Sequence, residues 1–193
     1  MESHRKHRKY LITDVHKVFV KVGGYRELSQ YFQVTETYLR QKMSAKGRIN
    51  NLILIMPIPE KYKLYLDDFR HPSDSFQYTG HVLYKEEWLI VRNYDDFCEA
   101  IKNLGMPEFI SFDHDLADEH YHPDMYDKEK YSKLVFKEKT GYDCAKFLVD
   151  FCIENQKELP NFLVHSMNPA GRENILGLLT NFNKVQKEHG NLL

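Results

Sequence analysis

The sequence predicts an α/β fold in which helices flank a parallel sheet of about four strands, preceded by a small basic α+β module. Two observations lead to this prediction. Between residues 60 and 193, short apolar runs alternate with helical patterns, as they do when parallel strands are buried on both faces. At MPIPEKY, residues 56–62, two prolines disfavour helix and favour an extended connector. We therefore divide the chain into a module at 1–56 and a domain at 60–193.

The first module is predicted to contain a hairpin, two short helices and a closing strand. The segment YLITDVHKVFVKVGG alternates apolar and polar residues, as two short paired strands do. Leu28 and Phe32 in YRELSQYF are four residues apart, and TYLRQKM repeats this helical spacing. Thr35 or Thr37 could cap the second helix, and GRINNLILI would form the last strand. Two helices with so short a join resemble a helix-turn-helix, of the kind found on phage and mobile-element proteins.

The charge of the chain is unevenly distributed. Residues 1–50 contain 11 Lys and Arg against 4 Asp and Glu, whereas residues 51–193 contain 16 against 24. A helix-turn-helix places its second helix in the major groove and holds phosphates with basic side chains, which predicts DNA or RNA binding through residues 1–55. The candidate contacts are Arg40, Gln41, Lys42, Lys46 and Arg48. The alternative is that these charges form only a solvated face.

The domain is predicted to contain four strands and three helices. The strands lie in KYKLYLDD, EEWLIVRN, PEFISFDHDL and PNFLVHSMN, and the helices in YDDFCEAIKNLG, TGYDCAKFLVDFCIENQ and PAGRENILGLLTNFNKV. Pro169 is expected in the first turn of the last helix. The region between Arg70 and Lys85 shows no clear helix, so the first crossover is expected to be degraded. The long charged segment 117–139 is expected to be an active-site lid or disordered.

Ionisable and polar side chains follow three of the four predicted strands. Because the carboxyl ends of parallel strands share one edge of the sheet, where ligands bind, we expect these side chains to form one site. The residues after the first strand are Asp67, Asp68 and Arg70; those after the third are Asp113, His114 and Asp115; and those after the fourth are His165, Ser166, Asn168, Arg172 and Asn174. Each group alone could be a turn or a helix cap, but three such strand ends are hard to attribute to coincidence.

The residue types at this edge suit phosphate-ester chemistry. Repulsion among carboxylates is relieved by a hard divalent cation, so Asp67, Asp68 and Asp113 are the expected ligands of Mg²⁺ or Mn²⁺. Histidines transfer protons near neutral pH, and the catalytic candidates are His114, His165, Asp113 and Asp115. Arginines bind phosphate through two parallel donors, and a helix N-terminus adds backbone donors. The candidate phosphate-binding residues are Arg70, Ser166, Asn168, Arg172 and Asn174.

The segments LYLDDFRHP, FISFDHDL, TGYDCAKFLVDF and FLVHSMNPAGRENI together resemble the cyclic-phosphate-processing receiver-like domain family, over residues 60 to 185. The resemblance implies a receiver-like, flavodoxin-like fold and action on cyclic phosphates, in RNA repair or nucleotide-derivative metabolism. It places Asp67 and Asp68 at the acidic pair of receivers and Asp113 at the phospho-accepting aspartate. No fifth strand ending in a lysine is evident, and the two histidines are additions, which favours catalysis over phosphorelay switching.

These observations lead to a hypothesis of a cyclic phosphodiesterase or phosphohydrolase. Its substrate would be an RNA 2′,3′-cyclic phosphate end, an ADP-ribose cyclic phosphate or a cyclic-nucleotide signal, with a divalent metal or with the histidines alone. One alternative is a nucleic-acid-binding regulator whose receiver-like domain senses a nucleotide without turnover, and another is a degenerate receiver that serves as an interaction scaffold. The three cysteines have no metal-binding spacing, and no apolar run approaches the ~20 residues of a membrane span. We therefore expect a cytoplasmic protein of a bacterial cell or a phage-infected host.

Overall fold

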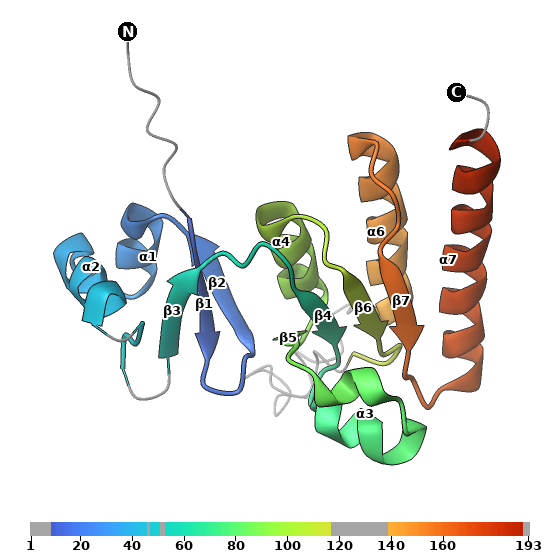
Figure 1. Ribbon diagram of the computed structural model, residues 1–193, viewed down its shortest axis with the longest axis horizontal. Helices are drawn as coiled ribbons and strands as arrows, with labels where there is room; N and C mark the ends of the chain where they lie inside the picture. Colours follow the sequence, from blue (N-terminus) through green and yellow to red (C-terminus); the bar gives the residue numbers. More distant parts are fainter. Residues whose placement is uncertain (1–8, 46, 51–52, 117–138, 191–193) are drawn as a thin grey trace, which may run out of the picture.

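The computed structural model describes residues 9–45, 47–50, 53–116 and 139–190 (Figure 1). Within them lie an antiparallel sheet with strand order β2-β1-β3 and a parallel sheet with strand order β5-β4-β6-β7. The parallel sheet with its flanking helices confirms the predicted receiver-like α/β fold. The predicted lid lies almost wholly outside the described residues. None of the described helices combines the length and the apolar character needed to span a lipid bilayer.

The N-terminal module is built as the sequence predicted, with two helices packed on a hairpin sheet. Its elements are β1 (Tyr10–Asp14), β2 (Phe19–Gly23), α1 (Tyr25–Tyr31), α2 (Glu36–Ala45) and β3 (Ile53–Pro57). Alternation along β1 turns Tyr10 and Ile12 toward Leu28 of α1 and Leu39 of α2, and these residues form a separate apolar core. Thr35, not Thr37, caps α2, because its Oγ1 accepts a hydrogen bond from a backbone N–H of the first turn at 3.1 Å.

The parallel sheet separates two layers. Its strands are β4 (Lys63–Leu66), β5 (Leu89–Val91), β6 (Phe109–Phe112) and β7 (Asn161–Val164). The crossover helices α4 (Tyr94–Leu104) and α6 (Gly141–Asn155) and the C-terminal helix α7 (Pro169–Gly190) accompany them. Leu64, Ile110 and Val164 pack with apolar residues of these three helices in the main core. Tyr65 points to the other face, where it packs with Tyr84 and Trp88. The cysteines are buried thiols within the helices.

The prediction that the first crossover lacks a helix is wrong. A two-turn helix, α3 (Pro72–Thr79), and a 3-10 turn, η1 (Val82–Lys85), connect β4 to β5. The helix α3 lies below the carboxyl ends of the parallel strands (Figure 1). It buries only Ser75, so it has no apolar periodicity for sequence analysis to find. Capping defines its start instead: the Asp74 carboxylate accepts a hydrogen bond from the His71 backbone N–H at 2.8 Å.

The N-terminal module packs against the outer edge of the parallel sheet. Leu11 and Phe19 belong to the same apolar core as the domain's strands and α4. The Ile90 backbone N–H donates to the Lys17 carbonyl at 3.0 Å, which extends the sheet beyond β5 by a single bridge. Lys21 Nζ also forms an ion pair with Oε1 of Glu99 in α4, at a distance of 2.7 Å. The module therefore covers an edge strand that would otherwise be open to pairing with other chains.

Phe19→Ala tests whether the module and the domain unfold together. Because Phe19 is 3% exposed in the shared core, its truncation is expected to lower the free energy of unfolding by about 3 to 5 kcal/mol. The measurement is urea unfolding followed by the fluorescence of Trp88, the single tryptophan, which lies in the domain. The matched control Phe69→Ala removes a ring that is 71% exposed and should change the free energy by less than about 1 kcal/mol. An unchanged Trp88 transition in Phe19→Ala contradicts a shared core.

Candidate functional site

The carboxyl ends of β4, β6 and β7 bring together residues that are far apart in the sequence. Arg70 joins two of these strand ends, because its Nε donates to Asp67 Oδ2 at 2.7 Å and its Nη2 donates to Asp113 Oδ2 at 2.6 Å. His165 comes from the third strand end, and its Nε2 lies 3.1 Å from the same Asp67 oxygen. The register of the parallel sheet explains this meeting, since Leu66, Phe112 and Val164 are paired neighbours one residue earlier.

Asp67 is the most enclosed member of the site. It has no exposed surface, and its Oδ1 accepts hydrogen bonds from the backbone N–H groups of Phe69 at 3.0 Å and Arg70 at 2.6 Å. Burial by itself raises the pKa of Asp67, but the hydrogen bond with His165 and the bonds from Arg70 outweigh it and lower this pKa to about 2. Asp67 is therefore charged at neutral pH, and Arg70 and His165 are arranged around this carboxylate.

His165 is held inside the protein on every side. It is 1% exposed, and its ring stacks on Tyr65 with centroids 4.4 Å apart. Its Nδ1 lies 2.7 Å from Ser111 Oγ, which in turn lies 2.8 Å from the Tyr84 hydroxyl. Both ring nitrogens are thus hydrogen-bonded to protein groups. This environment is more suitable for a histidine that positions Asp67 than for a histidine that contacts a substrate.

His114 has a different environment at the end of β6. Its Nδ1 lies 2.9 Å from Asp115 Oδ1, and its side chain is 18% exposed. The hydrogen bond with His114 is the main cause that lowers the pKa of Asp115. The Asn168 amide also donates to Asp115, at 3.2 Å, and so links this pair to the start of α7. A Cβ atom on Gly171 would overlap the His114 ring, so α7 can approach this closely only with glycine there.

The structure adds two residues to the candidate site that sequence analysis did not single out. Arg92 follows β5, and its Nη1 donates to the carbonyls of Asp67 at 3.0 Å and Arg70 at 2.6 Å. Tyr78 comes from α3; its hydroxyl accepts from Arg70 Nη1 at 3.3 Å and donates to the His165 carbonyl at 2.8 Å. The sequence could have indicated Arg92, because this residue directly follows a predicted strand, as Asp67 and Asp113 do. It could not have indicated Tyr78, because α3 was not expected.

The remaining candidates lie at the start of α7. Ser166 is buried, and its Oγ accepts from the Asn168 backbone N–H at 3.2 Å. Arg172 uses one Nη1 donor on the Val164 carbonyl at 2.8 Å, while the residue as a whole is exposed. Asn174 is exposed on α7, and no described contact joins it to the carboxylates. These residues thus border the site, and the closest contacts within it belong to Asp67, Arg70, Asp113 and His165.

The segment of the chain that forms this site also matches a known protein family. A family model described as the cyclic-phosphate processing receiver domain matches residues 62–181, which run from just before β4 into α7. The chain belongs to this family. The match includes every candidate residue of the acidic edge and ends before the last turns of α7. The N-terminal module lies outside the match, and no curated protein and no solved structure matches the chain.

The receiver domain contains a cluster of three aspartates whose oxygen atoms are suitable ligands for a divalent cation. Carboxylate oxygens of Asp67, Asp68 and Asp113 all lie within 4.8 Å of one another. Oxygen ligands of this kind suit Mg²⁺ and Mn²⁺. The three are not equivalent, because Asp67 already accepts bonds from two backbone N–H groups, Arg70 and His165. Asp113 accepts a single described hydrogen bond, from Arg70, and so keeps more acceptor capacity for a cation.

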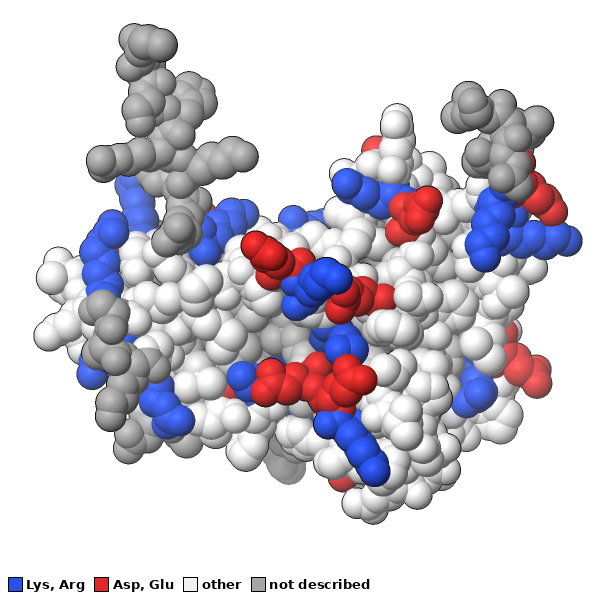
Figure 2. Space-filling model, viewed as in Figure 1, with Lys and Arg blue, Asp and Glu red and all other residues white. Residues whose placement is uncertain are grey.

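The candidate nucleic-acid contacts lie on or near α2, away from the acidic edge (Figure 1). Lys and Arg dominate the charged side chains of the module at the left of the view in Figure 2. Arg40 is paired with Glu36 at 3.2 Å, and its guanidinium lies 4.3 Å from the centre of the Tyr25 ring. Lys42 lies over the Tyr38 ring, and the exposed candidates include Gln41 and Arg48. Lys46 lies outside the described residues.

The lowered pKa of Asp67 predicts that the stability of the fold depends on pH. Above about pH 4 this carboxylate is charged in the folded and in the unfolded chain, and its partners stabilise the fold. As pH falls from about 4 toward 2, the unfolded chain binds the proton first, and the free energy of unfolding decreases by about 2 kcal/mol. Asp67→Asn is expected to abolish this step. At pH 7 it should also destabilise the chain by about 3 to 5 kcal/mol, because Arg70 and His165 lose a buried partner.

The measurement is urea unfolding of the wild type and of Asp67→Asn at intervals between pH 7 and pH 2. Asp95→Asn is the control, because Asp95 is an exposed acid of α4 outside the site, and it should keep the full decrease. If Asp67→Asn loses as much stability between pH 4 and pH 2 as the wild type, the charge of Asp67 is not what stabilises the site.

Proposed function

We propose that the chain is a phosphoesterase that opens a cyclic phosphate of an RNA end or of a nucleotide derivative. The candidate substrates are a 2′,3′-cyclic phosphate, an ADP-ribose cyclic phosphate and a cyclic-nucleotide signal. Membership of the cyclic-phosphate processing receiver family supports the substrate class. The observation that carries the proposal is Arg70, a guanidinium fixed between Asp67 and Asp113 at the end of the sheet and beside the His114–Asp115 pair.

Arg70 is arranged to bind phosphate. Its Nε and one Nη2 donor are used by Asp67 and Asp113, and Nη1 donates to Tyr78, so two of the five N–H groups of the guanidinium have no hydrogen-bond partner among the described residues. Burial disfavours the charged form of Arg70, but the two carboxylates outweigh it and raise its pKa. A fixed, charged donor that is already desolvated stabilises the negative charge that builds on phosphorus at little cost of reorganisation.

His114 is the group to which we assign proton transfer. If Nδ1–H donates to Asp115, then Nε2 is left as the acceptor, and the carboxylate holds the ring in that tautomer. In the proposed reaction, Nε2 takes a proton from water while the water oxygen forms a bond to phosphorus. One P–O bond of the ring breaks, and the released ribose oxygen ends with a proton. The net reaction consumes one water and yields a phosphate monoester.

His165 has a supporting role in this proposal. Because its nitrogens are bonded to Asp67 and Ser111, it fixes the carboxylate that in turn orients Arg70. A divalent cation would be held by Asp113 and Asp68, and by Asp67 to the extent that its hydrogen bonds allow. When bound, such a cation polarises a phosphoryl oxygen. Catalysis by His114 and Arg70 alone is the metal-independent form of the same proposal.

Turnover assays test the proposal with pure protein and the three candidate substrates, in added Mg²⁺ or Mn²⁺ and in EDTA. His114→Asn should lower kcat by about 100-fold or more, because it removes the proton acceptor. Gly171→Ala should lower kcat in the same direction, because its Cβ displaces the His114 ring. Gly177→Ala is the matched control on α7, since no atom lies within 4 Å of its added Cβ. Full activity in EDTA selects the metal-independent form.

Absence of turnover with all three substrates and both metals would count against the phosphoesterase. Normal kcat in His114→Asn would instead remove the histidine from the mechanism. If a nucleotide binds at the acidic edge without any product, and His114→Asn leaves that binding unchanged, the chain fits the alternative of a nucleotide-sensing regulator.

We also propose that the basic module binds a nucleic-acid strand through α2, which would favour an RNA or DNA end as the substrate. The exposure of Gln41 and Arg48 and the excess of basic residues support this role. The triple variant Arg40→Ala, Lys42→Ala, Arg48→Ala is expected to weaken binding about 10-fold or more at low salt and to flatten its salt dependence. Fluorescence anisotropy of a labelled RNA and a labelled DNA duplex measures both, and Lys157→Ala, Lys184→Ala, Lys187→Ala is the charge-matched control. Equal binding by the two triple variants contradicts a role for α2.

A further inference from the structure

The parallel sheet ends at β7, and a pocket lies beside this strand. Within the described residues no fifth strand pairs with β7, so its outer edge is open. The pocket has a volume of about 500 Å³ and lies between the end of α3, η1, β7 and the first turns of α7. Among the residues that line it are Tyr78 and His81, which are exposed, and Tyr84, which is buried. The volume falls in the range of sites for small organic ligands.

The pocket adjoins the phosphate-binding groups. Tyr78 forms part of its wall, and the same residue bonds to Arg70 at 3.3 Å. His165 is a second shared residue, because it is one of the residues that line the pocket and its Nε2 lies 3.1 Å from Asp67 Oδ2. The pocket therefore lies next to the arginine to which the phosphate is assigned.

We propose that this pocket binds the nucleobase of the cyclic-phosphate substrate, an inference that rests on the proposed function. Aromatic walls suit a planar base, because stacking on tyrosine and histidine rings is favourable and tolerant of base identity. Ser166 and Arg172 add polar groups at one side of the pocket, as sites for orienting a base require. The pocket thus supplies affinity for nucleotides over other cyclic phosphates.

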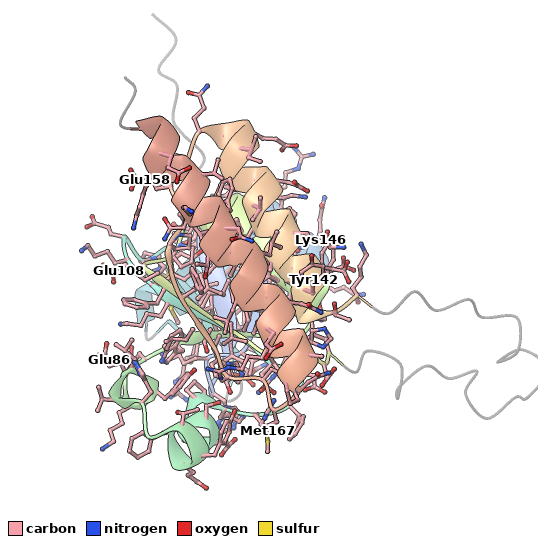
Figure 3. All side chains as sticks on the ribbon, turned by 90° about the vertical axis from the view of Figure 1, so that its right-hand side faces the viewer. Glu86, Glu108, Tyr142, Lys146, Glu158 and Met167 are labelled. Carbon is pink, nitrogen blue, oxygen red and sulfur yellow. The ribbon has the colours of Figure 1, made fainter. Side chains whose placement is uncertain are left out.

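The open edge of β7 favours a small ligand over an added peptide strand. The Val164 carbonyl, which an added strand would need, already accepts a hydrogen bond from Arg172 Nη1 at 2.8 Å. The strand itself has only four residues. Met167 provides access for a test, because it is 73% exposed, belongs to the pocket wall and lies at the foot of α7 beside α3 (Figure 3).

The test compares the binding of adenosine 3′-monophosphate and ribose 5-phosphate to the full chain by isothermal titration. Neither compound contains a cyclic phosphate, so the comparison does not depend on turnover. The wild type is expected to bind the adenosine compound about 10-fold or more tightly than the sugar phosphate, as base stacking predicts. Met167→Trp, which fills the pocket with an indole, should remove this preference. Ile153→Trp, on an exposed position of α6 outside the pocket, should retain it.

Circular dichroism checks that Met167→Trp is folded, and His81→Ala provides a second variant that removes an aromatic wall and should also reduce the preference. Equal affinities of the two compounds for the wild type overturn the proposal, as does an unchanged preference in both pocket variants. A preference that disappears in these variants supports the pocket even if no cyclic phosphate is hydrolysed, in which case only the proposed function fails. Conversely, hydrolysis of cyclic phosphates without any preference for the base refutes the pocket alone.

Discussion

The arrangement of the site depends on the burial of one carboxylate, Asp67. A charge with no exposed surface costs several kcal/mol unless it is paired and hydrogen-bonded, so the groups around it are not free to vary. Arg70 and His165 satisfy its side chain, and Arg92 satisfies the carbonyls next to it. These partners come from the ends of three strands, which is why the edge of the sheet becomes a single rigid centre rather than a set of separate turns.

The same constraint divides the polar groups into those that are enclosed and hold the site and those that we propose to face a ligand. Asp67 and His165 are enclosed, whereas Arg70 keeps unused donors and His114 keeps an exposed edge. Helices α6 and α7 also approach these polar groups closely. A Cβ on Gly141 would overlap the Asp113 carbonyl at the start of α6, as a Cβ on Gly171 would overlap His114 at the start of α7. Two glycines therefore let two helix N-termini reach the carboxyl end of β6.

Sequence analysis could predict the features that depend on periodicity and topology. Apolar runs and helical spacing indicated the strands and the longer helices, and parallel order required Asp67, Asp113 and His165 to meet at one edge. It could not predict α3, whose short helix is defined by caps and buries one serine. Without α3, the contacts of Tyr78 had no basis. The sequence also could not show that His165 is buried while His114 is partly exposed, because the face on which a side chain lies depends on where each strand ends.

The most direct test of the central claim is a crystal structure of the His114→Asn variant soaked with adenosine 2′,3′-cyclic phosphate. We expect the phosphate to contact the remaining donors of Arg70, with Asp67 still bonded to Arg70 and His165 and with the substituted side chain at position 114 facing the phosphorus atom. A phosphate bound away from this edge, or an Arg70 that has left Asp67 and Asp113, would contradict the view that the buried carboxylate prepares the arginine for its ligand.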